Sequence, residues 1–111
     1  MYVRNCDIKK VLIGVPKGQK HLRIALILEN GETIVFSEAT IANITRAYIA
    51  VKTHPTIRAI ELEKKTLDKE SIKGGYAECQ LLETSRQPDE VEDEINKIMS
   101  SQMFLPSNLS V

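Results

Sequence analysis

Large aliphatic residues alternate with other residues between positions 22 and 29, and this period of two predicts a β-strand. The aliphatic positions of one side are Leu22, Ile24, Leu26 and Leu28. Asn30 and Gly31 follow, and this dipeptide is typical of a two-residue type I′ turn. We therefore expect a β-hairpin whose return strand covers residues 32–37.

The register of this hairpin decides which side chains share a face. A two-residue turn places Ile27 opposite Ile34 and Ala25 opposite Phe36. Residues 24, 26, 28 and 35 then lie on the other face, so both faces are apolar. Two helices cannot easily cover both faces, and so we expect that the sheet curls into a partial barrel or that a second subunit supplies the missing layer. This is the main reason to predict a homo-oligomer, most simply a dimer.

The remaining elements follow from the same patterns. A β-branched run predicts a strand over residues 10–15, closed by a turn at residues 16–18. Helical spacing begins at Glu38 and ends at His54 and Pro55, because the residue before a proline is disfavoured in a helix. Its expected apolar stripe is Ile41, Ile44, Tyr48 and Val51. Two more strands are expected over residues 56–63 and 76–83.

A second helix is predicted to begin near Ser85 or Gln87, because Pro88 and the acidic residues after it suit a first helical turn. Its apolar stripe is Val91, Ile95, Ile98 and Met99. The order β-β-β-α-β-β-α predicts an α+β fold, with a mainly antiparallel sheet of about five strands and two helices packed on one face. We expect one α+β domain over residues 1–101 and an irregular tail over residues 102–111.

The tail carries three consecutive large apolar residues, which are Met103, Phe104 and Leu105. Exposing all three would leave an unusually adhesive patch. They are therefore candidates for self-association, unless they fold back on their own domain.

Composition fits a single globular domain: 111 residues, 42% hydrophobic and 27% charged. Neither a membrane-spanning run nor an export signal is recognisable, so we expect a cytoplasmic protein that does not enter a membrane. The two cysteines, Cys6 and Cys79, are expected to be reduced and buried. The sequence contains no recognisable metal- or cofactor-binding motif, and we expect neither a bound metal nor a cofactor.

The zero net charge hides a polarity along the chain. Residues 1–28 carry six basic residues and one acidic residue, whereas residues 75–111 carry seven acidic and two basic residues. Such ends can attract each other within a subunit or across a dimer, and a basic end can also attract a polyanion. The basic residues of the N-terminal segment are Arg4, Lys9, Lys10, Lys17, Lys20 and Arg23.

A glycine- and lysine-rich loop after the first strand holds the candidate phosphate or ligand contacts, Lys17, Lys20, His21 and Arg23. An ordinary solvated hairpin loop explains the same residues, because phosphate-binding loops normally lead into a helix.

Three classes of function remain, and we favour a small, non-enzymatic, self-associating interaction module of unknown ligand. Nucleic-acid or nucleotide-phosphate binding through the basic N-terminal segment is the alternative. A small enzyme is the third class, and it would need Cys6 or Cys79 within hydrogen-bond reach of His21 or His54. We assign no catalytic residue.

Overall fold

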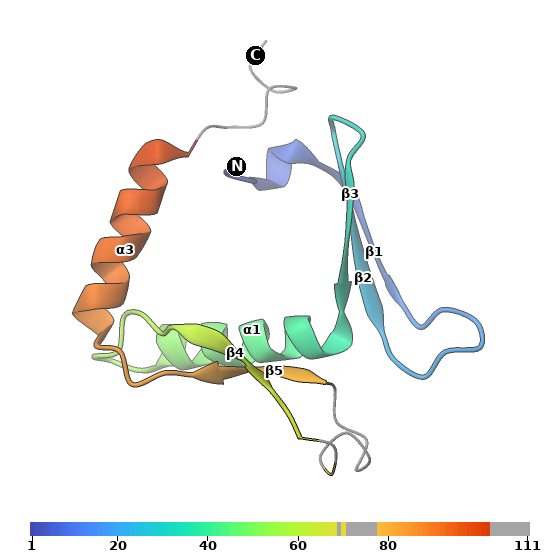
Figure 1. The fold of residues 1–111 in the computed structure, drawn as a ribbon. Coiled ribbons are helices and arrows are strands. Elements are labelled where there is room, and N and C mark those ends of the chain that lie inside the picture. The colour runs from blue at the N-terminus through green and yellow to red at the C-terminus, as the bar shows by residue number, and fades with distance from the viewer. Residues whose placement is uncertain (69, 71–77, 103–111) are drawn as a thin grey trace. The chain divides into compact units, whose positions relative to one another are not determined.

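The structure is a computed structural model that describes residues 1–68, 70 and 78–102. Figure 1 shows the elements in the order expected from the sequence, three strands, a helix, two strands and a helix. All strand pairs are antiparallel, which confirms the α+β class. The chain forms two compact units, residues 39–95 and the remainder, and each is described by itself below.

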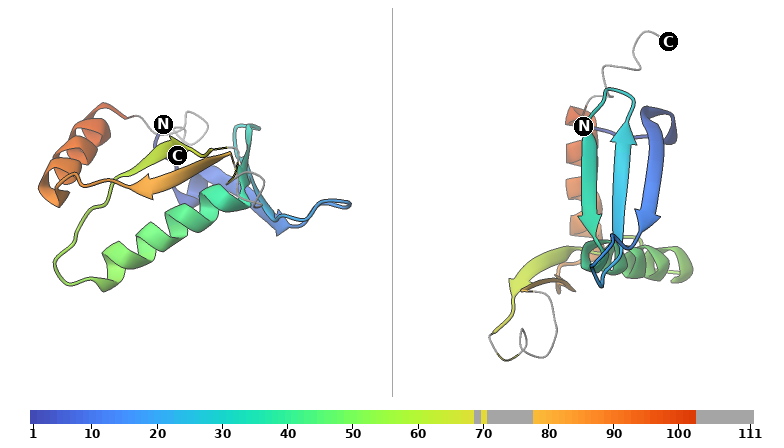
Figure 2. Two further views of the ribbon diagram at one scale, coloured as in Figure 1. Left: turned by 60° about the horizontal axis from the view of Figure 1, so that its bottom comes forward. Right: turned by 90° about the vertical axis from the view of Figure 1, so that its right-hand side faces the viewer.

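The first unit contains a three-stranded sheet that is preceded by the 3-10 turn η1 (Asn5–Asp7). Its strands are β1 (Ile8–Gly14), β2 (Arg23–Leu28) and β3 (Thr33–Ser37). The spatial order is β1-β2-β3, with β2 in the centre, as the right-hand view of Figure 2 shows. The three predicted strands are therefore present, and their bounds agree with the sequence pattern to within two residues.

The turn between β2 and β3 has three residues, so the expectation of a two-residue type I′ turn is wrong. The amide of Leu28 donates to the carbonyl of Glu32 at 2.9 Å, and the amide of Gly31 donates to the carbonyl of Leu28 at 3.0 Å. Gly31 has φ +92°, whereas Asn30 has no positive φ. The Asn30 side chain instead accepts a hydrogen bond from the Glu32 amide at 3.0 Å. This is the arrangement of a type I turn followed by a left-handed glycine.

The additional turn residue shifts the register by one position. Ala25 lies opposite Val35, and Leu26 lies opposite Ile34. One face of the sheet consequently contains only apolar residues, which are Ile8, Val11, Ile13, Ile24, Leu26, Leu28, Ile34 and Phe36. The other face is mixed, and its members are Lys10, Leu12, Arg23, Ala25, Ile27, Thr33, Val35 and Ser37. The prediction of two apolar faces is therefore wrong, because a one-residue slip moves side chains to the opposite face.

The centre of the first unit lies where η1 meets the end of β2. Leu28 and Asp7 are both 0% exposed. The Asp7 carboxylate accepts a hydrogen bond from the Arg4 amide at 2.7 Å, and the Asp7 carbonyl accepts one from the Glu29 amide at 2.9 Å. The Arg4 guanidinium lies 3.4 Å from the same carboxylate. The N-terminal turn is thus attached to the sheet through polar groups that are satisfied around a buried leucine.

The second unit contains most of α1 (Glu38–Thr53), the hairpin of β4 (Leu62–Thr66) and β5 (Cys79–Glu83), and the start of α3 (Pro88–Ser101). The bounds of α1 and the start of α3 are those expected from the sequence. β4 lies later in the chain than residues 56–63, because Lys64 and Lys65 pair with Leu81 and Gln80. The five strands form separate sheets of three and two strands, rather than the single sheet that was expected.

Helix α1 buries only part of its predicted apolar stripe, because Ile41 and Val51 are half-buried whereas Ile44 and Tyr48 are exposed. Ile44 and Tyr48 are 47% and 62% exposed. The half-buried positions include residues 40, 43, 47 and 51, and the Asn43 side-chain amide lies 3.4 Å from the Gln80 side-chain oxygen. Of the stripe predicted for α3, Val91 is buried, whereas Ile95, Ile98 and Met99 are exposed.

Replacing Leu28 by alanine tests the centre of the first unit. Because this side chain is fully buried, we expect Leu28→Ala to lower the free energy of unfolding by about 2–5 kcal/mol. Urea unfolding followed by circular dichroism measures the change. Val35→Ala is the matched control, because Val35 is 60% exposed and its truncation should change stability by less than about 0.5 kcal/mol. Equal losses from the two variants would contradict this assignment of the core.

Candidate interaction surface

Strand β1 lies at the edge of the three-stranded sheet, and among the described residues it pairs with β2 alone. Three consecutive residues in it are large, apolar and exposed: Val11 at 45%, Leu12 at 53% and Ile13 at 65%. Since successive side chains of a strand point to opposite faces, β1 offers apolar groups on both faces. We call the segment from Lys10 to Gly14 the β1 edge.

The β1 edge is bounded on both sides by irregular backbone. The pairing with β2 shifts between Ile8 and Lys10, so Lys9 is an extra, bulged residue. After Gly14 the chain leaves the sheet and turns, with the Gln19 amide donating to the Pro16 carbonyl at 3.1 Å. The regular part of β1 therefore covers the five residues of the β1 edge.

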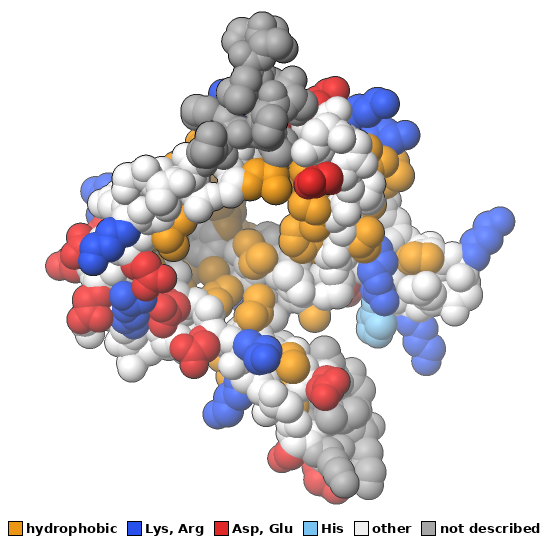
Figure 3. Space-filling view, turned by 45° about the horizontal axis from the view of Figure 1, so that its top comes forward, with side chains coloured by type: hydrophobic (Ala, Val, Ile, Leu, Met, Phe, Trp, Pro, Cys, Tyr) orange, Lys and Arg blue, Asp and Glu red, His pale blue; other side chains and the backbone are white. Residues whose placement is uncertain are grey.

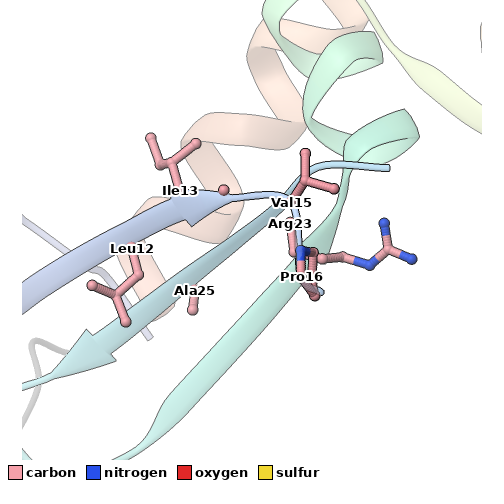
Figure 4. Close-up of a pocket in the computed structure, with 7 residues that line it drawn as sticks. Leu12, Ile13, Val15, Pro16, Arg23 and Ala25 are labelled. Atoms are coloured by element: carbon pink, nitrogen blue, oxygen red, sulfur yellow. The ribbon is translucent and has the colours of Figure 1, made fainter. Parts of the chain in front are cut away.

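A shallow hollow of about 340 Å³ adjoins the β1 edge. Figure 4 shows its lining, which consists of Leu12, Ile13, Gly14, Val15, Pro16, Arg23 and Ala25. The Arg23 guanidinium extends away from Leu12 and Ile13, and it donates a hydrogen bond to the Leu22 carbonyl at 3.1 Å. The hollow is thus apolar, with one cationic group at its margin.

Of the predicted ligand contacts, Arg23 belongs to this hollow. Lys17, Lys20 and His21 lie in the exposed loop between β1 and β2. Gly18 has φ +77° and is the third residue of the turn from Pro16 to Gln19. A type II turn requires this left-handed conformation at its third residue. Figure 3 shows basic side chains distributed over the projecting loop. An ordinary solvated hairpin loop explains these features at least as well as a phosphate-binding site does.

The candidates for self-association in the tail, Met103, Phe104 and Leu105, lie outside the described residues. Their role therefore stays a prediction.

A second polar cluster, which the sequence analysis did not identify, surrounds Arg86 in the second unit. The Arg86 guanidinium contacts Glu61 at 2.8 Å, Glu90 at 3.6 Å and also Glu94. Thr84 donates a hydrogen bond from its hydroxyl to the Glu61 carboxylate at 2.9 Å and accepts one from the Arg86 amide at 3.3 Å. The spacing of Arg86, Glu90 and Glu94 at intervals of four could have indicated part of this cluster.

These contacts neutralise part of the acidic C-terminal segment. Arg86 and Thr84 hold the pKa of the Glu61 carboxyl below its ordinary value, and the carboxylates of Glu94 and Glu61 raise the pKa of Arg86. Glu92 is paired with Arg58 at 3.2 Å. Figure 3 shows acidic and basic side chains intermingled over α3. Three of the seven acidic residues of the C-terminal segment, Glu90, Glu92 and Glu94, are therefore paired within residues 58–94, which weakens the argument that opposite chain ends attract each other.

His54 and Cys79, two of the residues considered for a cysteine–histidine enzyme, make hydrogen bonds with neighbouring turn and strand residues. The His54 Nδ1 atom accepts hydrogen bonds from the amides of Thr56 and Ile57, each at 3.2 Å, so this ring stabilises the turn after α1. Cys6 and Cys79 are both exposed, which contradicts the expectation that they are buried, and their reduced state stays a prediction. The Cys79 sulfur lies 4.0 Å from the Thr66 hydroxyl. These contacts give His54 and Cys79 no catalytic geometry.

Comparisons with protein-family models, with curated proteins and with solved structures find no match to this chain. Within the described part of the chain, no helix is both long and apolar enough to cross a bilayer. The same residues contain no group of three or more His, Cys, Asp or Glu that could hold a metal ion. The surface itself is therefore the basis for any functional proposal.

The Arg86 cluster predicts a pH dependence of stability. Because the pKa of Glu61 is lower in the folded chain, its contribution is present above its unfolded pKa and is lost as the pH falls through the folded value. We expect Glu61→Gln to lower the melting temperature at pH 7, and we expect the difference from the wild type to shrink towards pH 3. Thermal unfolding at both pH values measures this effect. A difference that persists unchanged at pH 3 would contradict the stated role of the Glu61 charge.

Proposed function

We propose that this chain is a non-enzymatic protein-interaction module whose partner is a second copy of itself. The observation that carries the proposal is the β1 edge, where Val11, Leu12 and Ile13 are all exposed although they are consecutive in a strand. Edge strands of stable monomers are usually protected by charge, proline or a covering segment, since they otherwise pair with another chain. β1 has two lysines and a bulge at its start, but residues 11–13 carry neither charge nor proline and present apolar groups.

The sheet face that continues from the β1 edge also supports this proposal. Val11 and Ile13 share their face with five further apolar residues of β2 and β3. Association at β1 would therefore extend an apolar surface that already exists. Burying apolar surface is favourable by roughly 25 cal/mol per Å² and is the main driving force of most protein association.

A reducing compartment such as the cytoplasm is the setting that we propose for the module. Cys6 and Cys79 are both exposed free thiols. In an oxidising compartment, exposed thiols readily form disulfides between chains. The proposed association needs no covalent link and agrees with reduced cysteines.

A polyanion ligand is the competing function, because Lys17, Lys20 and His21 are exposed beside Arg23. A protein that binds through phosphate contacts loses affinity steeply as salt rises. The affinity of an apolar association, by contrast, changes little over moderate salt concentrations. Salt dependence therefore separates the two functions.

The proposal predicts the mass of the protein in solution. We expect light scattering at micromolar concentration to give about twice the chain mass of 12.5 kDa, in both 50 mM and 500 mM salt. Ile13→Asp should weaken the association by at least about tenfold, because it places a charge in an apolar interface. Ile13 is 65% exposed, so the variant should keep the circular dichroism spectrum of the wild type.

Tyr48→Asp is the matched control, since Tyr48 is 62% exposed but lies on α1. This variant should retain the wild-type mass. A monomeric wild-type protein would refute self-association, and salt-dependent binding of an oligonucleotide by that monomer would favour the polyanion function instead.

A further inference from the structure

We infer that two copies pair edge to edge through β1, antiparallel and with Leu12 opposite Leu12 of the second copy. The two three-stranded sheets then form one six-stranded antiparallel sheet. This inference rests on the proposed function and specifies its geometry. It assigns an interface, the β1 edge, and a partner, the same edge of another copy.

The open side of β1 supplies the backbone groups for this pairing. A strand at the edge of a sheet has amide and carbonyl groups that its single neighbour does not use. Two antiparallel strands related by a two-fold axis satisfy these groups reciprocally. The five regular residues of the β1 edge can form roughly five hydrogen bonds, at about one for each opposed pair.

The side chains select the register. With Leu12 opposite its own copy, Val11 lies opposite Ile13 and Lys10 lies opposite Gly14. Every apolar residue of the β1 edge thus faces an apolar residue, and each lysine faces a position without a side chain. The bulged Lys9 remains outside the regular ladder.

Registers centred nearer the start of β1 are less favourable on charge and regularity. Centring the pair at or between Lys9 and Lys10 places lysines directly opposite each other, and like charges in such pairs are destabilising. Centring it on Val11 brings the bulged Lys9 opposite Ile13 and replaces an apolar contact with a charged one. The register centred on Leu12 avoids both conflicts.

The apolar face of the sheet also becomes continuous in this arrangement. Val11 and Ile13 of each copy meet on the face that contains only apolar residues. Leu12 of each copy meets on the mixed face, in the same row as Ala25 and Val35. The interface therefore has apolar contacts on both faces of the joined strands.

The other edge of the sheet is the natural comparison. β3 has five residues, and Val35 is the one large apolar residue in it that is exposed, at 60%. β1 has three such residues in succession. Leu12 and Val35 lie in one row on either side of Ala25, so they form a matched pair for testing the two edges.

Disulfide trapping tests the edge. In a Cys6→Ser, Cys79→Ser background that retains the wild-type mass, Leu12→Cys should form a covalent dimer under mild oxidation. Directly opposed residues have Cα atoms about 4.5–5.5 Å apart, which is within the range of a disulfide. Val35→Cys in the same background should remain largely uncrosslinked. The readout is a non-reducing gel, with the reduced sample as the reference.

Mixing experiments test the register. Val11→Cys and Ile13→Cys should each crosslink poorly alone, because each residue is offset by two positions from its own copy, or about 7 Å along the strand. A mixture of the two variants should crosslink efficiently. Efficient crosslinking of Val11→Cys alone would instead place the axis at Val11 and overturn the proposed register.

A charge exchange gives a readout without oxidation. Val11→Glu and Ile13→Lys should each dimerise at least tenfold more weakly than the wild type, because each places an unpaired charge against an apolar residue. Mixed together, they should form a heterodimer in which the new glutamate faces the new lysine. The control mixture of Val11→Glu with Val11→Lys should stay dissociated, since these positions are not opposed.

The outcomes separate the inference from the proposed function. A wild-type monomer refutes both. A wild-type dimer in which Leu12→Cys does not crosslink and the charge exchange does not restore association keeps the module but refutes pairing through β1. Trapping by Val35→Cys rather than Leu12→Cys assigns the interface to β3 and likewise overturns the inference.

Discussion

The three-residue turn between β2 and β3 determines which side chains of the first unit share a face. Gly31 adopts a left-handed conformation at φ +92°, and the turn begins at Glu29, one residue earlier than the expected two-residue turn. Leu26 consequently lies opposite Ile34. Ile24, Leu26, Ile34 and Phe36 of β2 and β3 therefore share one face. Val11 and Ile13 of β1 extend that face to the edge of the sheet.

This register changes the physical reason for expecting an oligomer. Two apolar faces would require a second layer on the sheet, whereas the structure has one wholly apolar face and one mixed face. The stronger feature is now the exposed edge, which carries consecutive apolar residues and unused backbone groups. Self-association therefore remains the best-supported function, but its argument depends on strand pairing at an edge.

Local sequence patterns were sufficient for the element order and for most boundaries. The helix from Glu38 to Thr53 follows from spacing and from Pro55, and these are local effects of backbone sterics. The turn type was not predictable in the same way, because Asn-Gly is compatible with more than one turn. The contact between Asn43 of α1 and Gln80 of β5 is likewise tertiary, and hydrophobic spacing does not encode it.

The charged residues show the same limit in the candidate site. Net charge along the chain suggested opposite ends that attract each other, but Glu61, from a distant segment, joins Glu90 and Glu94 around Arg86. The sequence indicates only the contacts of Arg86 with Glu90 and Glu94, because these three residues are spaced four apart. Because such pairs use charge within one unit, they leave less of it for long-range attraction. Apolar contacts and backbone hydrogen bonds at the β1 edge are consequently a more specific basis for association than net charge, since they define an axis and a register.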